Sequence, residues 1–458
     1  MALLWEETVQ EALEKFISDP RRYRNRLEKL QKKYGPRGQA YELNQGGAYL
    51  IDFIDDQKKL AQLIASAVRD GSYRLSPARL KTLHLDKERI IYSFELLDLL
   101  IHGVVADALM VTLREKSSRH LYSYFAGISA LTPLHEFSKF IRKHRSDVFQ
   151  VEKRGQYVLR FDVKKYTEMI PVGQASPLWD QLVQLVSPQT LRKETLTLLK
   201  SVVRPEVRND DGTLFTPLFG VPTGSPISTL IANLYLAPID RALESIEGGF
   251  YARFGDDLLF AHPDPQITRE VLQTVSLELK RLGLEANLEK QKILFFNGAG
   301  RPSPHWPEAQ GTEYLNFLGH RIAFTGAVQL NSEKLHQTIE DLCSRLSASG
   351  KNLMGLVPTE RGKVLCQIAN DALTPSHPFA LPYSHFLTRV LNDRKQLKQL
   401  DYTIALHISQ LVSGVSGVRS FRTVAYRTLR EKWQLKSLVK IRNTHENREL
   451  AQGPGLHR

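Results

Sequence analysis

Three aspartates lie within or beside apolar, strand-like runs, and their arrangement could support metal chemistry. Asp256 and Asp257 follow a Phe-Gly pair between two β-type runs in residues 250–262, a pattern that predicts a hairpin with the acids at its turn. Asp162 lies inside the apolar run VLRFDV, where an unpaired carboxylate is costly to bury. Because Gly-Asp turns are also common at exposed surfaces, the chemical interpretation depends on Asp162 joining the pair.

A divalent cation would explain acids in these positions. If neighbouring strands bring Asp162 beside Asp256 and Asp257, three like charges converge and require a counter-ion. Oxygen-only ligands favour Mg²⁺, with Mn²⁺ as a possible substitute, over zinc. Two such ions about 3.5–4 Å apart can activate an attacking 3′-hydroxyl and stabilise a leaving pyrophosphate. We therefore expect a site with two Mg²⁺ ions, in which all three aspartates are catalytic residues and metal ligands.

The segment between the acids has a feature suited to phosphate ligands. Residues 220–233 read GVPTGSPISTLIAN, a loop rich in glycine and proline that opens onto a helix. Glycine lets a substrate approach the backbone closely, and the amides of a helix N-terminus attract phosphate groups. Such a loop is weak evidence by itself, but its position between Asp162 and the Asp256–Asp257 hairpin favours a nucleotide site.

The pattern around these residues indicates an α+β fold. Apolar residues at alternating or helical spacing predict strands over 157–163 and 314–323, and helices over 95–113, 228–247 and 267–282. Beyond residue 330 the pattern is mostly helical. The longest apolar stretch, 96–111, is interrupted by two acids and a histidine, which favours a buried helix over a membrane span, and we expect no membrane partner.

Composition and charge narrow the class of protein. The chain has 458 residues, of which 42% are hydrophobic and 24% charged, as in a globular protein of about two to four domains. Its 62 Lys and Arg exceed its 49 Asp and Glu by 13, which favours a polyanionic partner such as nucleic acid. The two cysteines, Cys343 and Cys366, lack metal-ligand spacing, and the N-terminus does not resemble a secretion signal. We therefore expect a cytoplasmic protein without zinc or disulfides.

Taken in order, these features resemble the palm of a reverse transcriptase. The resemblance rests on Asp162 in FDVKKY, the loop and helix from Gly220 to Asn233, the Phe-Gly-Asp-Asp hairpin, Lys290 in NLEKQK, and Phe317-Leu318-Gly319. Upstream, residues 86–109 and 121–129 are similar to the fingers of bacterial enzymes of this family. The resemblance implies an α+β, right-hand polymerase with fingers, a palm built on an antiparallel sheet, a thumb, and helical N- and C-terminal extensions.

The resemblance also suggests boundaries along the chain. We expect an N-terminal helical extension over 1–70, then fingers and palm over 71–330, with palm motifs at 157–171, 220–262 and 287–320. A thumb-like helical region would follow over 331–400, and a basic helical region over 401–458.

Further residues acquire roles only through the resemblance. Asp162 and Asp256 would bridge the metal ions with support from Asp257, and the carbonyl of Val163 would be a further ligand. The roles toward the nucleotide fall to Arg89 and Lys87 at the triphosphate, Thr223 and Gly224 in the pocket, and Lys290 as the acid for pyrophosphate. The family usually has an aromatic residue five positions after the first Asp, which excludes the ribose 2′-hydroxyl. Thr167 stands there instead, so either sugar discrimination is weaker or Tyr166 replaces the missing ring.

The function that the resemblance implies is RNA-directed DNA polymerisation, with an RNA template and a DNA product. Because the chain shows no nuclease or integrase motif, it is most similar to stand-alone bacterial enzymes of the defence-associated or unknown group. That group implies a structured non-coding RNA, a partner protein or homo-oligomer, and a role in antiphage defence.

Other functions of the same fold remain open. One is template-independent synthesis, and another is an RNA-dependent RNA polymerase, which usually has a second Asp where Thr167 stands. A third is a maturase-like, RNA-binding cofactor without activity, for which three intact and mutually repelling acids are unfavourable.

The C-terminal region carries a run of positive charge. Between Asp401 and Glu431 there is no acidic residue, whereas basic and aromatic residues accumulate at Arg419, Arg422, Arg427, Arg430, Trp433, Lys436 and Lys440. Arginine interleaved with aromatic residues can bind phosphates and stack on bases. The same pattern suits a packed helix with a solvated basic face, so the sequence leaves both interpretations open.

Overall fold

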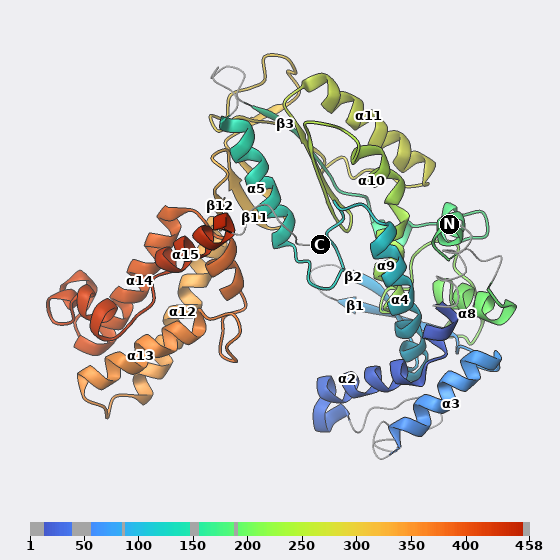
Figure 1. The fold of residues 1–458 in the computed structure, drawn as a ribbon, viewed down its shortest axis with the longest axis horizontal. Helices are drawn as coiled ribbons and strands as arrows, with labels where there is room; N and C mark the ends of the chain where they lie inside the picture. The colour runs from blue at the N-terminus through green and yellow to red at the C-terminus, as the bar shows by residue number, and fades with distance from the viewer. Residues whose placement is uncertain (1–12, 39–55, 85–87, 147–154, 187–190, 452–458) are drawn as a thin grey trace. The chain divides into compact units, whose positions relative to one another are not determined.

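The computed structural model describes residues 13–38, 56–84, 88–146, 155–186 and 191–451. In these ranges the chain forms helices and three β-sheets, in agreement with the expected α+β class (Figure 1). By its internal contacts the chain divides into two compact units. Unit 1 comprises residues 1–129 and 157–293, and unit 2 comprises residues 130–156 and 294–458.

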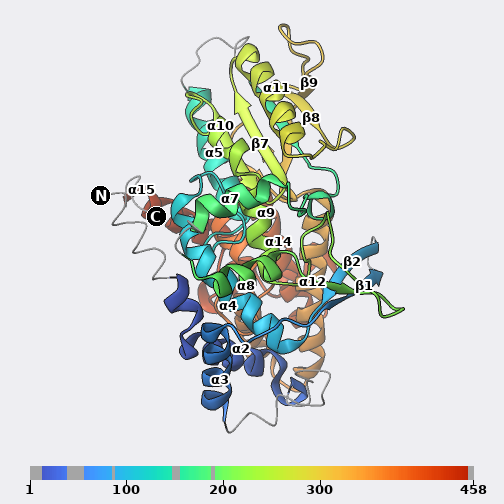
Figure 2. The same ribbon diagram turned by 90° about the vertical axis from the view of Figure 1, so that its right-hand side faces the viewer.

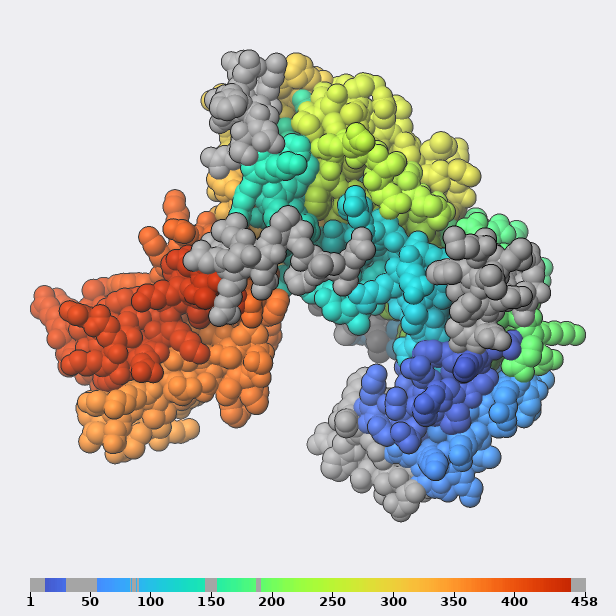
Figure 3. Space-filling view, viewed as in Figure 1, coloured from blue at the N-terminus to red at the C-terminus, as the bar shows by residue number. Residues whose placement is uncertain are grey.

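Several helices of unit 1 pack around one apolar helix, α4 (Leu96–Lys116). Helices α2 (Pro20–Gly38) and α3 (Gln57–Asp70) pack together, and α2 also packs on α4 (Figure 3). Helix α4 further contacts α7 (Pro177–Val186) and α9 (Ile227–Tyr235). Among the described residues, α4 is the one helix whose length and composition would suit a membrane crossing, and most of it is buried inside the protein. Its burial on several sides accounts for its continuous apolar sequence.

A four-stranded sheet in unit 1 has the order β2-β1-β4-β5. Its strands are β1 (Ala78–His84), β2 (Glu88–Ser93), β4 (Val207–Arg208) and β5 (Leu214–Phe215). β1 pairs with β2 antiparallel and with β4 parallel. Helix α8 (Lys193–Val203) precedes β4 and packs against α3 and α9.

A five-stranded sheet has the order β6-β7-β3-β8-β9. Its strands are β6 (Phe250–Phe254), β7 (Asp257–His262), β3 (Gln156–Phe161), β8 (Lys292–Phe296) and β9 (Gln310–Thr312). The three strands β6, β7 and β3 pair antiparallel and are nearly continuously buried, which explains their apolar sequences.

Two helices pack beside this sheet in unit 1. Helix α11 (Pro265–Arg281) contacts both β7 and α10 (Ala237–Leu243) (Figure 2). The side chain of Asp264 accepts a hydrogen bond from the amide of Gln266, and Pro265 occupies the first helical position. This is a strong helix start, because it satisfies an amide that the helix itself leaves free.

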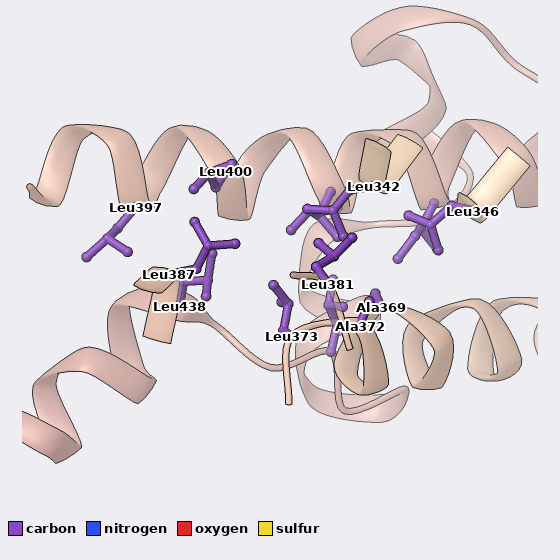
Figure 4. Packing of buried hydrophobic residues seen from close by; sticks show 14 of the residues in the cluster. Leu342, Leu346, Ala369, Ala372, Leu373, Leu381, Leu387, Leu397, Leu400 and Leu438 are labelled. Carbon is purple, nitrogen blue, oxygen red and sulfur yellow. The ribbon is translucent and has the colours of Figure 1, made fainter. Parts of the chain in front are cut away.

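Unit 2 combines a small sheet with a helical bundle. Helix α5 (Leu131–Ser146) contacts β12, the last strand of the antiparallel sheet β10 (Tyr314–Phe317), β11 (His320–Ala323) and β12 (Val328–Gln329). The other helices are α12 (Ser332–Asn352), α13 (Pro358–Ala372), α14 (Arg394–Ser413) and α15 (Leu438–Ala451), joined by short turns η4 (Phe386–Val390), η5 (Gly417–Arg422) and η6 (Thr428–Lys432). Their leucines and alanines form one core (Figure 4). Cys343 and Cys366 are free thiols of this unit.

The two compact units follow a different division from the regions expected from the sequence, whose boundaries stay predictions. No division occurs at residue 70, because α3 packs on α8 within unit 1. None occurs at residue 400, because α14 contacts α12, α13 and α15 in a single core. Residues 294–330 and 130–156 belong to unit 2 rather than to the region that carries the acids.

Two predicted elements are interrupted. The helix predicted over 228–247 divides into α9 and α10 at Leu236, because Pro238 lacks the amide hydrogen that a continuous helix requires. The strand predicted over 314–323 is the hairpin β10–β11, in which Leu318 and Gly319 both have positive φ. Positive φ at both turn positions is the backbone pattern of a tight two-residue hairpin turn.

Candidate active site

The three predicted aspartates meet at one end of the β6-β7-β3 sheet in unit 1. The register pairs Phe161 with Leu258, so the next residues, Asp162 and Asp257, lie opposite each other where β3 ends and β7 begins. Phe254 pairs with Asp257 across the hairpin, which leaves Gly255 and Asp256 as the two turn residues. The φ of Gly255 is +66°, and glycine is the residue that accepts a positive φ at the first turn position without strain.

Two of the acids are paired with cations of the chain. The Nζ atom of Lys290 lies 3.0 and 2.9 Å from the two carboxylate oxygens of Asp162, and Asn287 Nδ2 donates to Asp162 Oδ1 at 3.1 Å. Asp257 Oδ1 accepts from Arg160 Nη2 at 3.1 Å, a diagonal contact across β3 and β7. Both pairs are partly exposed, so they orient the carboxylates more than they stabilise the fold.

Asp256 differs electrostatically from its neighbours. Burial raises the pKa of Asp256, and repulsion from Asp162 and Asp257 adds to this rise. Among the residues that the structure describes, no side chain forms an ion pair with Asp256. Its charge is therefore the one that a bound cation would compensate most effectively.

The donor set fits a hard divalent cation. Val163 forms an isolated antiparallel bridge with Ala286, flanked by hydrogen bonds from Asn287 N to Asp162 O and from Lys164 N to Glu285 O. In this pattern the amide and carbonyl of Val163 point away from the 285–287 segment, which leaves the carbonyl available as a ligand. Carboxylate and carbonyl oxygens are the ligands that Mg²⁺ prefers.

The described residues do not form a closed metal cage. No group of three His, Cys, Asp or Glu side chains in them is arranged to hold a metal ion. The physical reason is visible in the pairs above, since Lys290 and Arg160 draw the carboxylates of Asp162 and Asp257 toward themselves. The fit to a cation therefore rests on the chemistry of the donors and on the buried charge of Asp256.

A buried ion pair anchors the hairpin that carries Asp256 and Asp257. Arg253, in β6, is fully buried, and its Nε and Nη2 atoms donate to the two carboxylate oxygens of Asp240 at 2.7 and 2.5 Å. The same guanidinium donates to the carbonyl of Gly255 at 3.1 Å and to that of Asn233 at 2.8 Å. Burial alone would lower the pKa of Arg253, but the Asp240 carboxylate outweighs burial and raises it. The turn that carries Asp256 is thus tied to α9 and α10.

Our sequence predictions did not include Arg253 or Asp240. The signal was a lone arginine in the apolar run FYARF, which must find a buried acid if that run is a central strand. Which acid would pair with it could not be read from the spacing.

The glycine-rich loop docks against the segment that follows Asp162. The amide of Gly220 donates to Ile170 O at 2.9 Å, and that of Val221 donates to Thr167 O at 2.8 Å. The φ of Gly220 is +90°, and a Cβ there would lie 3.4 Å from the carbonyl oxygen of Glu168. The close approach of the two backbones therefore depends on glycine at this position.

The same loop also covers the free edge of β2. Thr223 Oγ1 donates to Ile90 O at 3.0 Å, and Tyr92 N donates to Thr223 O at 2.7 Å. Gly224 has a φ of +102°, and a Cβ there would lie 2.6 Å from the backbone oxygen of Tyr92. Thr223 and Gly224 are thereby held next to the strand that carries Arg89.

A buried histidine holds the end of this loop. His102 Nδ1 lies 2.8 Å from Ser225 Oγ, and the amide of Ile227 at the start of α9 donates to the same oxygen at 3.3 Å. Burial lowers the pKa of His102 to about 3, so the imidazole is neutral. Both side chains are almost fully buried, which excludes a nucleophilic role and leaves a structural one.

The remaining predicted nucleotide contacts fall into three groups. Lys290 lies at the aspartates, as described above. Arg89 is placed in β2 by its backbone only, opposite Leu83, and Lys87 lies outside the described residues. Tyr166 is buried and its hydroxyl donates to Ala232 O at 2.6 Å, a position that does not fit the expected contact with the nucleotide sugar. Thr167, beside it, is half-buried.

Comparison with known protein families gives a match over this region. Residues 111–322 match the family described as reverse transcriptase (RNA-dependent DNA polymerase). The matched range contains all three aspartates, the loop from Gly220 and Lys290. A curated relative, the telomerase reverse transcriptase of Rattus norvegicus, is 27% identical over 148 residues, which cover 31% of this chain and 13% of that protein. The chain therefore matches about an eighth of the length of this relative.

Solved structures of telomerases are also similar to this chain. Telomerase from Candida albicans with a TWJ fragment of telomeric RNA is 13% identical, covers 82% of this chain and 67% of its own, and gives a TM-score of 0.42. Telomerase from Candida tropicalis with the same kind of fragment is 15% identical, covers 81% and 64%, and gives a TM-score of 0.43. Apo telomerase from Candida tropicalis truncated from its C-terminal domain is 17% identical, covers 56% of each chain, and gives a TM-score of 0.40.

Proposed function

We propose that residues 111–322, which match the reverse transcriptase family, form an active RNA-directed DNA polymerase with Asp162, Asp256 and Asp257 as its catalytic residues. The observation that carries the proposal is the β3–β7 register, which sets Asp162 opposite Asp257 and Asp256 at the adjoining turn. A nucleotidyl transferase needs oxygen ligands around one point, and these three acids lie together at one sheet end within the matched range.

Asp162, Asp256, Asp257 and the carbonyl of Val163 would hold two Mg²⁺ ions, which Mn²⁺ could replace. When bound, these ions supply the charge that activates a primer 3′-hydroxyl and stabilises the leaving pyrophosphate. The chain contributes the positions of its carboxylates: Asn287 and Lys290 orient Asp162, and Arg160 orients Asp257. Burial raises the pKa of Asp256, and a bound cation would lower it, so cation binding and loss of the proton from this group should be coupled.

The nucleotide would lie over the exposed side of the glycine-rich loop, next to β2. Gly224 is exposed and carries no side chain, so a base or sugar can approach the loop backbone there. Arg89, in β2, and Lys87 would meet the triphosphate, and Lys290 would protonate the leaving pyrophosphate. With Tyr166 held in the core, Thr167 would face the ribose, and discrimination against ribonucleotides would be weak.

The wider biological role is also a proposal. The net charge of +13 and the resemblance of residues 86–109 and 121–129 to bacterial fingers support a cytoplasmic enzyme that works with a structured non-coding RNA in antiphage defence. A partner protein or a homo-oligomer would complete the complex. The rat telomerase match covers too little of that protein to support a telomeric substrate.

The experiment is extension of a labelled DNA primer on an RNA template with deoxynucleotides and Mg²⁺. We expect template-dependent extension by the wild type and a loss of about 100-fold or more for Asp256→Asn, with no change for Asp180→Asn, an exposed acid on α7. Extension that ignores the template, or that prefers ribonucleotides, would overturn the assignment in favour of the other polymerase classes. Equal rates for wild type and Asp256→Asn would contradict the proposed site.

A further inference from the structure

One face of α14, in unit 2, is basic and aromatic. Lys395, Lys398 and Tyr402 are spaced by three and four residues and therefore share one side of the helix. All three are exposed, and 43% of the Tyr402 surface is accessible. The core of unit 2 is on the opposite side of α14, where Leu397 and Leu400 are buried (Figure 4).

This face continues into a row of three aromatic rings. The ring of Phe421, in η5, has its centroid 5.9 Å from that of Tyr402 and 6.0 Å from that of Tyr426. Tyr426 is 40% exposed. Arg419 and Arg422, which flank Phe421, are exposed as well.

Two basic-region residues highlighted in the sequence serve the fold instead. Arg430 lies 5.0 Å from the Tyr426 ring centroid and donates to the Tyr426 hydroxyl at 3.0 and 2.9 Å, so it holds that ring in place. It also pairs with Asp401 at 3.2 Å. A Cβ at Gly362 would lie 2.1 Å from the Trp433 ring, which shows that Trp433 packs against α13.

The nearest acids do not offset the positive charge. Asp401 is only 4% exposed, and its carboxylate accepts from Ser437 Oγ at 2.6 Å and Leu438 N at 2.9 Å in addition to Arg430. Glu431 pairs with Arg427 at 2.7 Å. In the described chain, this face therefore presents positive charge around aromatic rings with its nearby carboxylates already paired.

We propose that this surface, which we call the tyrosine surface, binds single-stranded nucleic acid. It comprises Lys395, Lys398, Tyr402, Arg419, Phe421, Arg422 and Tyr426. Exposed rings of Tyr402 and Tyr426 offer faces on which unpaired bases stack, and the surrounding lysines and arginines meet phosphates. A duplex offers only its stacked edges and phosphates, so the exposed rings favour a single strand. The site is separate from the proposed polymerase function, since none of its residues lies in unit 1.

Photo-crosslinking of the full-length chain measures this contact directly. The probes are an oligouridylate with 4-thiouridine and its deoxy counterpart with 4-thiothymidine, and crosslinked peptides are identified by mass spectrometry. We expect crosslinks in the peptides that contain Tyr402, Phe421 or Tyr426. The probe that gives the higher crosslinking yield shows whether the surface prefers RNA or DNA. The crosslinks should persist in Asp256→Asn, whatever that variant does to polymerisation.

Variants separate stacking from charge. Tyr402→Ala should weaken crosslinking at the surface about 5-fold or more, whereas Tyr402→Phe should retain it and shows that the fold is intact. A plot of the log binding constant against log salt concentration should have a slope shallower by about 1.4 for Arg419→Gln/Arg422→Gln. Each lost phosphate contact on a single strand removes about 0.7 from this slope. The control Arg301→Gln/Tyr383→Ala changes the same residue types elsewhere in unit 2 and should have no effect.

The proposal is overturned if wild-type crosslinks never map to these peptides. It is also overturned if Tyr402→Ala crosslinks as well as Tyr402→Phe, or if the control variant loses as much as the surface variants. Sedimentation with anionic lipid vesicles that depends on Arg419 and Arg422 but not on Tyr402, without oligonucleotide crosslinks, would assign the surface to a membrane instead.

Discussion

Removing the charge of Asp240 should cost more stability than any surface change in this chain, because it leaves a cation in the core. Arg253 is fully buried and directs two of its four hydrogen bonds to Asp240, at 2.7 and 2.5 Å. Breaking a buried pair by removing one partner costs about 3–5 kcal/mol, since the remaining charge stays uncompensated. Asp240→Asn keeps the side-chain shape and one acceptor oxygen, so we expect a loss at the lower end of this range, about 3 kcal/mol in the free energy of unfolding measured with denaturant.

The surface pair Arg281–Glu278 is the matched control. Its atoms lie 2.9 Å apart, but the arginine side chain is 72% exposed, so Glu278→Gln should cost less than about 1 kcal/mol. A cost for Asp240→Asn no larger than that of Glu278→Gln would refute the argument from burial.

A double substitution tests whether the pair also positions the active site. Replacing both partners, as Arg253→Met/Asp240→Leu, should restore much of the stability that Asp240→Asn loses, because no buried charge remains. The carbonyl of Gly255 nevertheless loses its donor, and displacement of the neighbouring Asp256 should lower the single-turnover rate of nucleotide incorporation by about 100-fold. A folded double variant with the wild-type rate would show that the pair serves stability alone.

Three further predictions concern the loop, a buried acid and the metal. Gly224→Ala should raise the KM for deoxynucleotides at least about 10-fold, because the new Cβ would lie 2.6 Å from Tyr92 O. Gly212→Ala is the control for backbone strain, since Gly212 has a φ of +85° but open space around its Cβ position. An equal effect of both substitutions would contradict the role of the contact with Tyr92. Burial raises the pKa of Asp98 to about 6, so the folded chain binds this proton more tightly than the unfolded chain does. The free energy of unfolding relative to Asp98→Asn should therefore fall by about 2 kcal/mol as pH rises from 4 to 7, and a rise or no change in urea unfolding would be evidence against this. Saturating Mg²⁺ should raise the thermal midpoint of the wild type, and chelation should reverse this rise. At a Mg²⁺ concentration about 100 times the dissociation constant, the gain in the free energy of unfolding is up to about 2.7 kcal/mol. The same shift in Asp256→Asn would show that this residue does not belong to the metal site.

The placement of the three aspartates at one sheet end was predictable because acids in apolar strands are conspicuous. A carboxylate inside VLRFDV and two more at a hairpin turn violate the apolar pattern of their strands, and the alternation of strands suffices to bring such residues to one sheet end. The glycine-rich loop was predictable for another reason. Gly220 and Gly224 adopt backbone conformations that few other residues accept, so glycine at these positions marks the loop in the sequence.

Contacts between distant segments were not predictable from these patterns. His102 and Ser225 are 123 positions apart, and neither sequence context indicates that α4 supports the loop before α9. The division into units likewise joins residues 130–156 to 294–458, a choice made by tertiary packing rather than by local composition. For Tyr166 the sequence left open whether the ring faces the sugar, and the structure places its hydroxyl in the core, bonded to Ala232 O.

The most direct test of the account is to sequence the RNA and DNA that co-purify with the full chain from cells that express it from its own gene locus. The wild type should be compared with Asp256→Asn/Asp257→Asn, which keeps the side-chain shapes but removes two of the three neighbouring carboxylate charges. The account predicts one discrete RNA bound to both proteins, and DNA complementary to that RNA only with the wild type. The same DNA in both samples, or bound RNA with no complementary DNA in either, would contradict RNA-directed DNA synthesis at these aspartates.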